Sequence, residues 1–221
     1  YKVSGGLHGV GASVVNALSS WVEVTVYQGG KVYQIRFENG GHTVKPLTII
    51  GDCPLERTGT TVTFKPDPSI FTETTIFNYE TLRKRIQELA FLNRGLSIVL
   101  VDERDKAELK KETFMYEGGI SAYVAMLNEH STPLHEKIIH LTGEEDGITL
   151  EVALQYNSGY QEKIYSFTNN IRTHEGGTHE DGVKRALTRI INNYARNAKI
   201  LKDNDDSLSG EDVREGLTMI I

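Results

Sequence analysis

Ser4-Gly5-Gly6-Leu7-His8-Gly9-Val10-Gly11 is the stretch that decides how this sequence is interpreted. Its closely spaced glycines permit positive φ angles and let a ligand approach the backbone without meeting a Cβ atom. Residues 12–20 follow at once with helical spacing, and the first amide N–H groups of a helix have no partner within it. Because the helix dipole adds about half a positive charge at that end, the expected ligand is an anion such as a phosphate chain.

Two common phosphate-binding motifs do not fit this loop. The Walker sequence G-x-x-x-x-G-K-[ST] is absent, because no Lys-Ser or Lys-Thr pair follows the glycines. The dinucleotide fingerprint G-x-G-x-x-G is also absent, since the spacing here is Gly6-x-x-Gly9-x-Gly11. A glycine turn that only caps a helix stays open as an alternative, and glycine density alone does not separate it from a phosphate-binding loop.

Composition indicates a globular protein of one large or two small domains. The chain has 221 residues, of which 38% are hydrophobic and 24% charged, and no apolar run approaches the ~20 residues of a membrane span. Cys53 is the single cysteine, which excludes an internal disulfide and fits a cytoplasmic location. The net charge of −6 argues against nucleic acid binding over the whole surface and leaves room for a local basic face.

Hydrophobic periodicity divides the first part of the chain into short elements. Residues 12–20 predict a helix, and residues 22–27 alternate valines with polar side chains, as expected for a half-buried strand. The Gly29-Gly30 pair predicts a hairpin. Further strands are expected at residues 32–37, 44–50, 60–64 and 96–102, and a charged amphipathic helix at residues 78–93.

A glycine break at Gly118-Gly119 predicts a domain boundary, with residues 1–118 in one domain and 119–221 in the next. In the second domain a long helix is expected from Thr178 to about residue 198, where Thr178 and Asp181 have the spacing of a capping box. Strands are expected at residues 137–141, 148–156 and 162–168, and a short helix at residues 120–127. Strands outnumber helices in both parts, so the expected class is α+β with antiparallel or mixed sheets.

Residues 1–19 resemble the nucleotide-lid segment of the gyrase B and topoisomerase IV B family, and the heptad GGLHGVG is far more specific than a lone glycine fingerprint. Later segments match the same family in order, over essentially the whole chain. They are residues 58–62 (TGTTV), 88–93 (ELAFLN), 116–119 (YEGG), 150–159 (LEVALQYNSG), 167–170 (FTNN), 175–179 (EGGTH) and 210–217 (GEDVREGL). This family belongs to the ATPase superfamily that includes Hsp90, MutL and histidine kinases.

The resemblance implies part of a two-layer α/β sandwich ATPase domain, followed by part of a transducer domain with a β-sheet and helices. It also implies that the loop amides wrap the phosphates of ATP, while a threonine hydroxyl supports the adenine pocket. The ATP-binding residues carried over are Tyr1, Lys2, Gly5, Gly6, Leu7, His8, Gly9, Val10, Gly11 and Thr60. The family's catalytic glutamate and its Mg²⁺-holding asparagine fall upstream, so the chain is expected to be an interior fragment with no catalytic residue and no Mg²⁺ ligand.

For the intact protein the resemblance implies an ATP-driven type II DNA topoisomerase. Its partners would be the DNA-cleaving A subunit of DNA gyrase, a second copy of itself, with which it dimerises when ATP binds, and double-stranded DNA. Two A and two B subunits would form a heterotetramer. The segments GGTHEDG (176–182) and SGEDVREGL (209–217) favour gyrase, which introduces negative supercoils, over topoisomerase IV, which relaxes and decatenates. A non-enzymatic nucleotide-binding module and a dinucleotide-dependent oxidoreductase are the alternatives from other classes.

The long helix from Thr178 begins acidic and then becomes basic, which a solvated helix with charges matched to its dipole explains. The resemblance adds a second interpretation, in which Lys184, Arg185 and Arg189 contact the phosphates of a passing DNA segment. His174 and His179 lie close by, but their spacing fits no zinc pattern, so no metal site is predicted.

Overall fold

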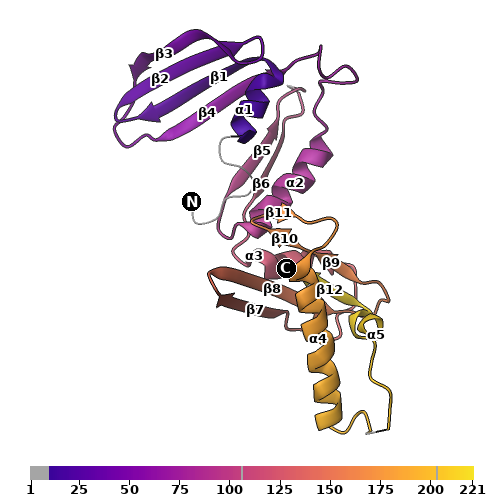
Figure 1. The fold of residues 1–221 in the computed structure, drawn as a ribbon. Helices are drawn as coiled ribbons and strands as arrows, with labels where there is room; N and C mark the ends of the chain where they lie inside the picture. Colours follow the sequence, from indigo (N-terminus) through magenta and orange to yellow (C-terminus); the bar gives the residue numbers. More distant parts are fainter. Residues whose placement is uncertain (1–9, 106, 203) are drawn as a thin grey trace. The chain divides into compact units, whose positions relative to one another are not determined.

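The computed structural model describes residues 10–105, 107–202 and 204–221, and the chain divides into two compact units (Figure 1). One unit contains residues 10–78, and the other contains the described residues from Tyr79 to Ile221. Among the helices of these described residues, none combines the length and the apolar character that crossing a membrane requires.

A four-stranded antiparallel sheet with one short helix makes up the unit of residues 10–78. Its elements are α1 (Val10–Ala17), β1 (Ser19–Gln28), β2 (Lys31–Glu38), β3 (His42–Asp52) and β4 (Gly59–Pro66), with the strand order β3-β2-β1-β4. Gly29 and Gly30 form the β1–β2 hairpin as predicted, both with positive φ. The helix predicted for residues 12–20 ends at Ala17 instead, because Ser19 already pairs with Pro66 in the sheet.

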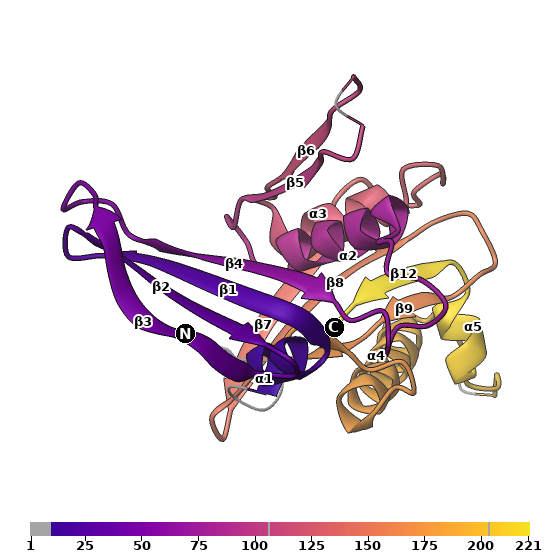
Figure 2. The ribbon, with the colours of Figure 1, turned by 90° about the horizontal axis from the view of Figure 1, so that it is seen from above.

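The second unit contains a mixed sheet, two hairpins and four helices among its described residues (Figures 1 and 2). Helix α2 (Tyr79–Leu92) precedes the hairpin of β5 (Ile98–Asp102) and β6 (Lys110–Phe114). The remaining elements are α3 (Gly119–Leu127), β7 (Ile139–Glu145), β8 (Ile148–Tyr156), β9 (Lys163–Tyr165), β10 (Phe167–Thr168), β11 (Ile171–Arg172), α4 (Thr178–Asn197), α5 (Gly210–Arg214) and β12 (Leu217–Ile220). The mixed sheet has the order β7-β8-β12-β9.

Strand β12 lies at the centre of this unit. It pairs antiparallel with β8 and parallel with β9. Met219 packs on one face of the sheet with Val183 and Leu187 of α4, whereas Ile220 belongs to the cluster of α3 on the other face. Because helices cover both faces, the whole strand is buried, and its sequence is largely apolar rather than alternating.

Two local expectations for this unit were wrong. The strand expected at residues 162–168 is interrupted at Ser166, which lies between β9 and β10. The Ser166 hydroxyl contacts Glu180 and Thr173 at 2.5 and 2.8 Å. Thr178 is the first residue of α4 rather than its cap: Gly177 is the N-cap, with φ 151° and no side-chain hydrogen bond. A reciprocal capping box does occur at the start of α5, between Ser209 and Asp212.

Candidate functional site

The glycine segment enters the described structure at the start of α1. Val10 and Gly11 are the first two residues of this helix. Apart from chain neighbours and the helix's own backbone, no atom of the described residues lies within 4 Å of the position that a Cβ of Gly11 would take. The space beside these helix amides is therefore open to a ligand. The other predicted loop residues lie outside the described residues: Tyr1, Lys2, Gly5, Gly6, Leu7, His8 and Gly9.

One face of the sheet in the first unit is apolar and ends in Thr60. Directly paired residues of neighbouring strands point to the same face. On β1 and β4 this face consists of Val22, Val24, Val26, Thr60, Val62 and Phe64. Val62 is 55% exposed and Val24 and Val26 are half-buried, whereas Val22 is buried, so the part of this face beside Thr60 is accessible to a flat apolar ligand. The sequence pattern identifies these valines only as part of a strand, and their pairing with Thr60 is what places a hydroxyl at the edge of an apolar floor.

The opposite face of the same sheet is polar and satisfied by its own side chains. Arg36 pairs with Glu38 at 2.8 Å and with Glu23 at 3.6 Å, and its guanidinium carbon lies 4.6 Å from the ring centroid of Trp21. Gln34 donates to the hydroxyl of Thr25 at 3.3 Å. These contacts pair the charged and amide side chains of β1 and β2 on that face with one another.

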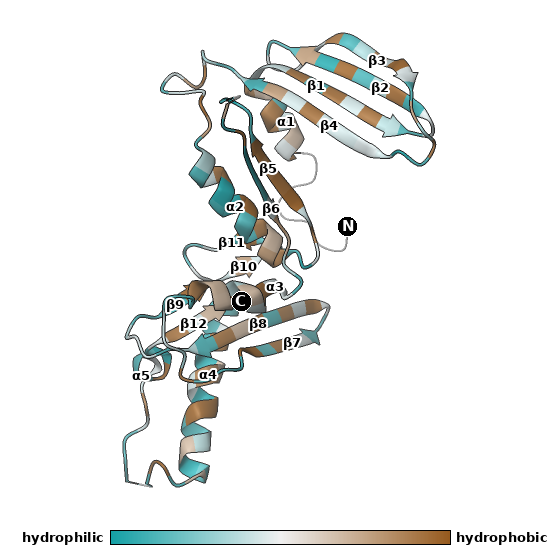
Figure 3. Cartoon of the chain, turned by 180° about the vertical axis from the view of Figure 1, so that it is seen from behind, coloured by the Kyte–Doolittle hydropathy of each residue, from teal (hydrophilic) through white to brown (hydrophobic). Residues whose placement is uncertain are grey.

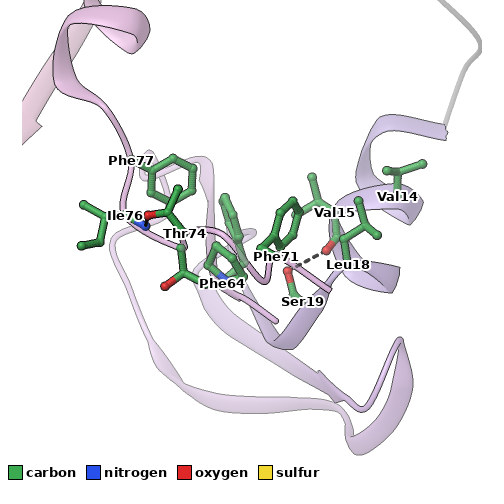
Figure 4. Close-up of a pocket in the computed structure, with 11 residues that line it drawn as sticks. Val14, Val15, Leu18, Ser19, Phe64, Phe71, Thr74, Ile76 and Phe77 are labelled. Atoms are coloured by element: carbon green, nitrogen blue, oxygen red, sulfur yellow. Dashed lines mark hydrogen bonds between the residues drawn. The ribbon is translucent and has the colours of Figure 1, made fainter. Parts of the chain in front are cut away.

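Helix α1 and residues 71–77 line a partly open cavity of about 190 Å³ at one end of the apolar face (Figure 4). Val15 of α1 and Leu18, which directly follows α1, face Phe64 of β4 and Phe71 of the following segment. The hydroxyl of Ser19 donates to the carbonyl of Val15 at 2.6 Å, so the cavity wall does not carry an unsatisfied donor at Ser19. The helix that carries the end of the glycine segment is thus held by apolar contacts around unfilled space.

Thr60 and the cavity beside α1 lie at different ends of β4. The cavity under α1 includes Phe64 and Pro66, whereas Thr60 lies near the other end of the strand. At ~3.3 Å per residue, Thr60 and Pro66 are roughly 20 Å apart along the strand. Thr60 and the cavity beside the end of α1 therefore lie at opposite ends of β4.

Among the cations predicted to contact DNA, the structure separates Lys184 from the two arginines. The ammonium of Lys184 pairs with Glu180 at 2.7 Å and with Glu162 at 3.2 Å, and Arg214 shares Glu162 at 2.8 Å. Arg185 and Arg189 lie one turn apart on α4 and line a shallow hollow together with Arg214. In the described part of the chain neither of these two arginines has an ion-pair partner.

Of the two histidines near the start of α4, His179 takes part in a polar network. His179 Nε2 lies 3.2 Å from the hydroxyl of Thr173, which contacts Ser166. His174 lines a neighbouring hollow. No group of three or more His, Cys, Asp or Glu side chains with metal-binding geometry occurs among the residues that the structure describes.

A buried polar cluster between α3 and the mixed sheet had no counterpart among the sequence predictions. Asn128 Oδ1 accepts hydrogen bonds from Thr218 at 2.7 Å and from Asn157 at 3.2 Å, and Asn128 Nδ2 donates to Gln155 at 3.0 Å. All four side chains belong to buried residues. The available signal was weak: a single threonine inside the apolar run LTMII and an amide in the strand LEVALQY.

Comparison with known proteins points to one family. Residues 119–221 match the family model described as DNA gyrase B. The chain is 58% identical to the B subunit of DNA gyrase from Streptococcus pneumoniae over 221 residues, which is all of this chain and 34% of that protein. It is 54% identical, also over its full length, to the B subunit of DNA gyrase from Staphylococcus epidermidis, of which it covers 34%. The chain thus spans about a third of the length of these relatives.

Solved structures agree with the sequence comparison. The crystal structure of the 43K ATPase domain of Thermus thermophilus gyrase B in complex with an aminocoumarin is similar with a TM-score of 0.81 and 38% identity, covering 96% of this chain and 57% of that one. The topoisomerase IV ATP binding domain of Francisella tularensis gives a TM-score of 0.74 at 26% identity, covering 98% of this chain and 58% of that one. The expected fold class, that of the gyrase B ATPase region, is confirmed.

Proposed function

We propose that this chain, which belongs to the DNA gyrase B family, is part of the ATPase subunit of a DNA gyrase. The complete protein would introduce negative supercoils into DNA by double-strand passage, driven by ATP hydrolysis, in the bacterial cytoplasm. The observation that carries this proposal is the 58% identity to the B subunit of a DNA gyrase over all 221 residues. The relatives are about three times as long, so this activity belongs to the complete protein rather than to this chain alone.

ATP fits the residues that the chain offers. The glycine segment from Gly5 to Gly11 and the amides that open α1 suit a phosphate chain, and none of the residues with described positions would meet a Cβ at Gly11. The apolar face of Val24, Val26 and Val62 suits an adenine ring, with the Thr60 hydroxyl at its edge. Tyr1 and Lys2 would lie near the phosphates. Mg²⁺ would neutralise charge on the phosphates, held by residues outside this chain.

We further propose that the chain divides functionally near Gly118, with the last part of an ATP-binding domain before it and the first part of a transducer domain after it. Arg185 and Arg189 would contact the phosphates of double-stranded DNA without reading its sequence, because cations on a helix face provide charge rather than base recognition. Lys184, which is held by Glu162 and Glu180, would support that face more than it touches DNA. The protein partners would be the A subunit of DNA gyrase and a second copy of the complete protein.

The test is a plasmid assay with the complete protein and its partner, the A subunit of the enzyme. Relaxed circular DNA with ATP and Mg²⁺ is expected to gain negative supercoils. Relaxation and decatenation without negative supercoiling would identify a topoisomerase IV, a related alternative given the similarity to the Francisella domain. Nucleotide binding with no turnover would instead identify a non-enzymatic module, and binding of NAD(H) would indicate an oxidoreductase.

A further inference from the structure

A groove of about 900 Å³ lies in the second unit, and none of the residues assigned to ATP or DNA lines it. Helix α2 forms one wall, α3 forms the floor, and β9 with the β10–β11 hairpin forms the other wall, elements that lie together in both Figures 1 and 3. Its volume is within the range of ~300–1,000 Å³ that is typical of small-molecule sites.

The floor of the groove is aromatic and aliphatic. Tyr123 is 6% exposed, its ring is stacked in parallel on Phe91 at 4.8 Å, and its centroid lies 6.1 Å from that of Tyr165. Met126 and Leu127 of α3 extend this surface. Because Tyr123 is itself buried, the accessible apolar floor consists of the half-buried Met126 and Leu127 and the 46% exposed Ile171, on a base that the Phe91–Tyr123 stack fixes. A fixed floor costs little entropy when a flat ligand binds.

The walls carry an excess of positive charge. Arg172 lies with its guanidinium carbon 4.1 Å from the ring centroid of Tyr165, and Lys84 stands on the facing wall. Within the described residues neither of these cations has a carboxylate within 4.0 Å. Arg85 is paired with Glu88, and Arg83 is paired with Glu112 outside the groove, so Lys84 and Arg172 account for the uncompensated charge.

We propose that this groove binds a small organic anion that combines a flat aromatic ring with a carboxylate or a phosphate. The ring would lie over Met126, Leu127 and Ile171, where apolar burial stabilises it. The anion would accept hydrogen bonds from Arg172, whose planar fork matches both oxygens of a carboxylate, while Lys84 contributes a point charge. Each half of the groove thus recognises one half of the ligand.

Binding would also have a mechanical consequence, which rests on the proposed function and domain division. Helix α2 precedes the proposed boundary at Gly118, whereas Arg172 and Tyr165 follow it. A ligand that contacts both sides would stiffen this connection and would favour whichever arrangement of the two domains keeps the groove formed. Such a ligand is expected to change the rate of ATP-driven strand passage without competing with ATP.

Calorimetric titration of the complete protein with 2-naphthoate tests the site. We expect saturable binding that persists in the presence of a saturating non-hydrolysable ATP analogue. 2-Naphthalenemethanol, which has the ring without the charge, and acetate, which has the charge without the ring, should each bind at least tenfold more weakly. The double variant Lys84→Ala/Arg172→Ala should lose at least tenfold in affinity, and Arg172→Lys should retain part of it.

Lys111→Ala is the matched control, since it removes an exposed lysine from β6 outside the groove. Unchanged melting temperatures would show that the variants are folded. Displacement of naphthoate by the ATP analogue, or equal binding by the double variant and the control, would overturn the proposal. Naphthoate binding is measured without DNA and without ATP turnover. The groove proposal can therefore fail while the supercoiling assay supports the proposed function, and the reverse outcome is equally distinguishable.

Discussion

At the scale of single residues, Asn128 has the largest expected effect on stability. Its side chain contacts Gln155, Asn157 and Thr218, and truncation would leave several buried polar groups with fewer partners. Because each unsatisfied buried group costs ~1–3 kcal/mol, Asn128→Ala should lower the free energy of unfolding by about 2–4 kcal/mol. Urea unfolding of the complete protein would measure this loss. Thr218→Val, which removes one donor and keeps the volume, should cost clearly less; equal losses would contradict the role of the network.

Tyr79 gives a pH prediction at the same scale. Its hydroxyl donates to Glu112 at 2.7 Å, and this hydrogen bond raises the pKa of Tyr79 to about 12 while lowering the pKa of Glu112. A raised tyrosine pKa contributes stability that is complete below its unfolded value of about 10 and is lost as the pH rises toward 12. The lowered carboxyl pKa contributes stability above its usual value of about 4.5, which is lost on acidification.

The stability difference between the wild type and Tyr79→Phe should therefore be constant near neutral pH and should shrink between about pH 10 and 12. Unfolding measured across this range for both proteins checks the sign. Tyr160→Phe is a suitable control, because Tyr160 is 84% exposed and removal of its hydroxyl should leave no such window. A difference that stays flat to pH 12 would show that the contact with Glu112 contributes nothing.

At the scale of elements, α1 depends on a few apolar contacts. Leu18 lines the cavity opposite Phe71, and its truncation would enlarge an existing void. Leu18→Ala should destabilise the first unit by about 1–3 kcal/mol and should weaken ATP binding, because the helix that follows the glycine segment loses its support. Hydrogen exchange of α1 and calorimetric ATP titration measure the two effects. Val44→Ala on exposed β3 is the control and should change neither.

Helix α4 carries the DNA prediction. Each phosphate contact that is lost should reduce the slope of log K against log salt by ~0.9 for duplex DNA. Arg185→Ala/Arg189→Ala in the reconstituted enzyme should therefore reduce the slope by up to about 2, measured by fluorescence anisotropy over a series of salt concentrations. Lys45→Ala on β3 should leave the slope unchanged. An identical slope for the double variant would show that Arg185 and Arg189 do not contact DNA phosphates and that α4 is a solvated helix.

Sequence patterns predict elements well where the pattern and the burial agree. The alternating valines of β1 and the amphipathic character of α2 each identify the element that the structure contains. The split at Ser166 and the buried Thr218 were not predictable, since both depend on partners that are distant in the sequence. The sheet order shows the same limit: β12 pairs with β8 and β9, more than fifty residues earlier, so no local pattern encodes it.

The candidate site was predictable only in part for the same reason. The glycine motif predicts its ligand from local chemistry, because backbone amides and missing Cβ atoms are properties of adjacent residues. The adenine floor is different: Thr60 and Val26 become neighbours only through the pairing of β1 with β4. The groove beside α2 is also built from three distant segments, and its charge excess emerges only once the partners of Arg83 and Arg85 are known.

At the scale of the whole molecule, a substitution at Gly11 should change thermal stability and nucleotide-driven dimerisation in opposite directions. A Cβ at Gly11 would contact none of the residues that the structure describes, and alanine in a helix is more stable than glycine by roughly 0.5–1 kcal/mol. Gly11→Ala should therefore raise the melting temperature slightly. The added methyl group would nevertheless occupy the space through which a phosphate approaches the helix amides, so ATP binding should fall at least tenfold.

This loss should extend to the assembled enzyme, because the proposed dimerisation of the protein depends on bound nucleotide. In sedimentation velocity with Mg²⁺ and a non-hydrolysable ATP analogue, the wild type should shift from monomer to dimer and Gly11→Ala should stay monomeric. Gly143→Ala is the matched control: this glycine on β7 also has open space at its Cβ and no positive φ. If Gly11→Ala dimerises at the nucleotide concentration that suffices for the wild type, this loop does not bind the ATP phosphates and the nucleotide site lies elsewhere. If Gly11→Ala stays monomeric while Gly143→Ala dimerises normally, the effect is assigned to the loop.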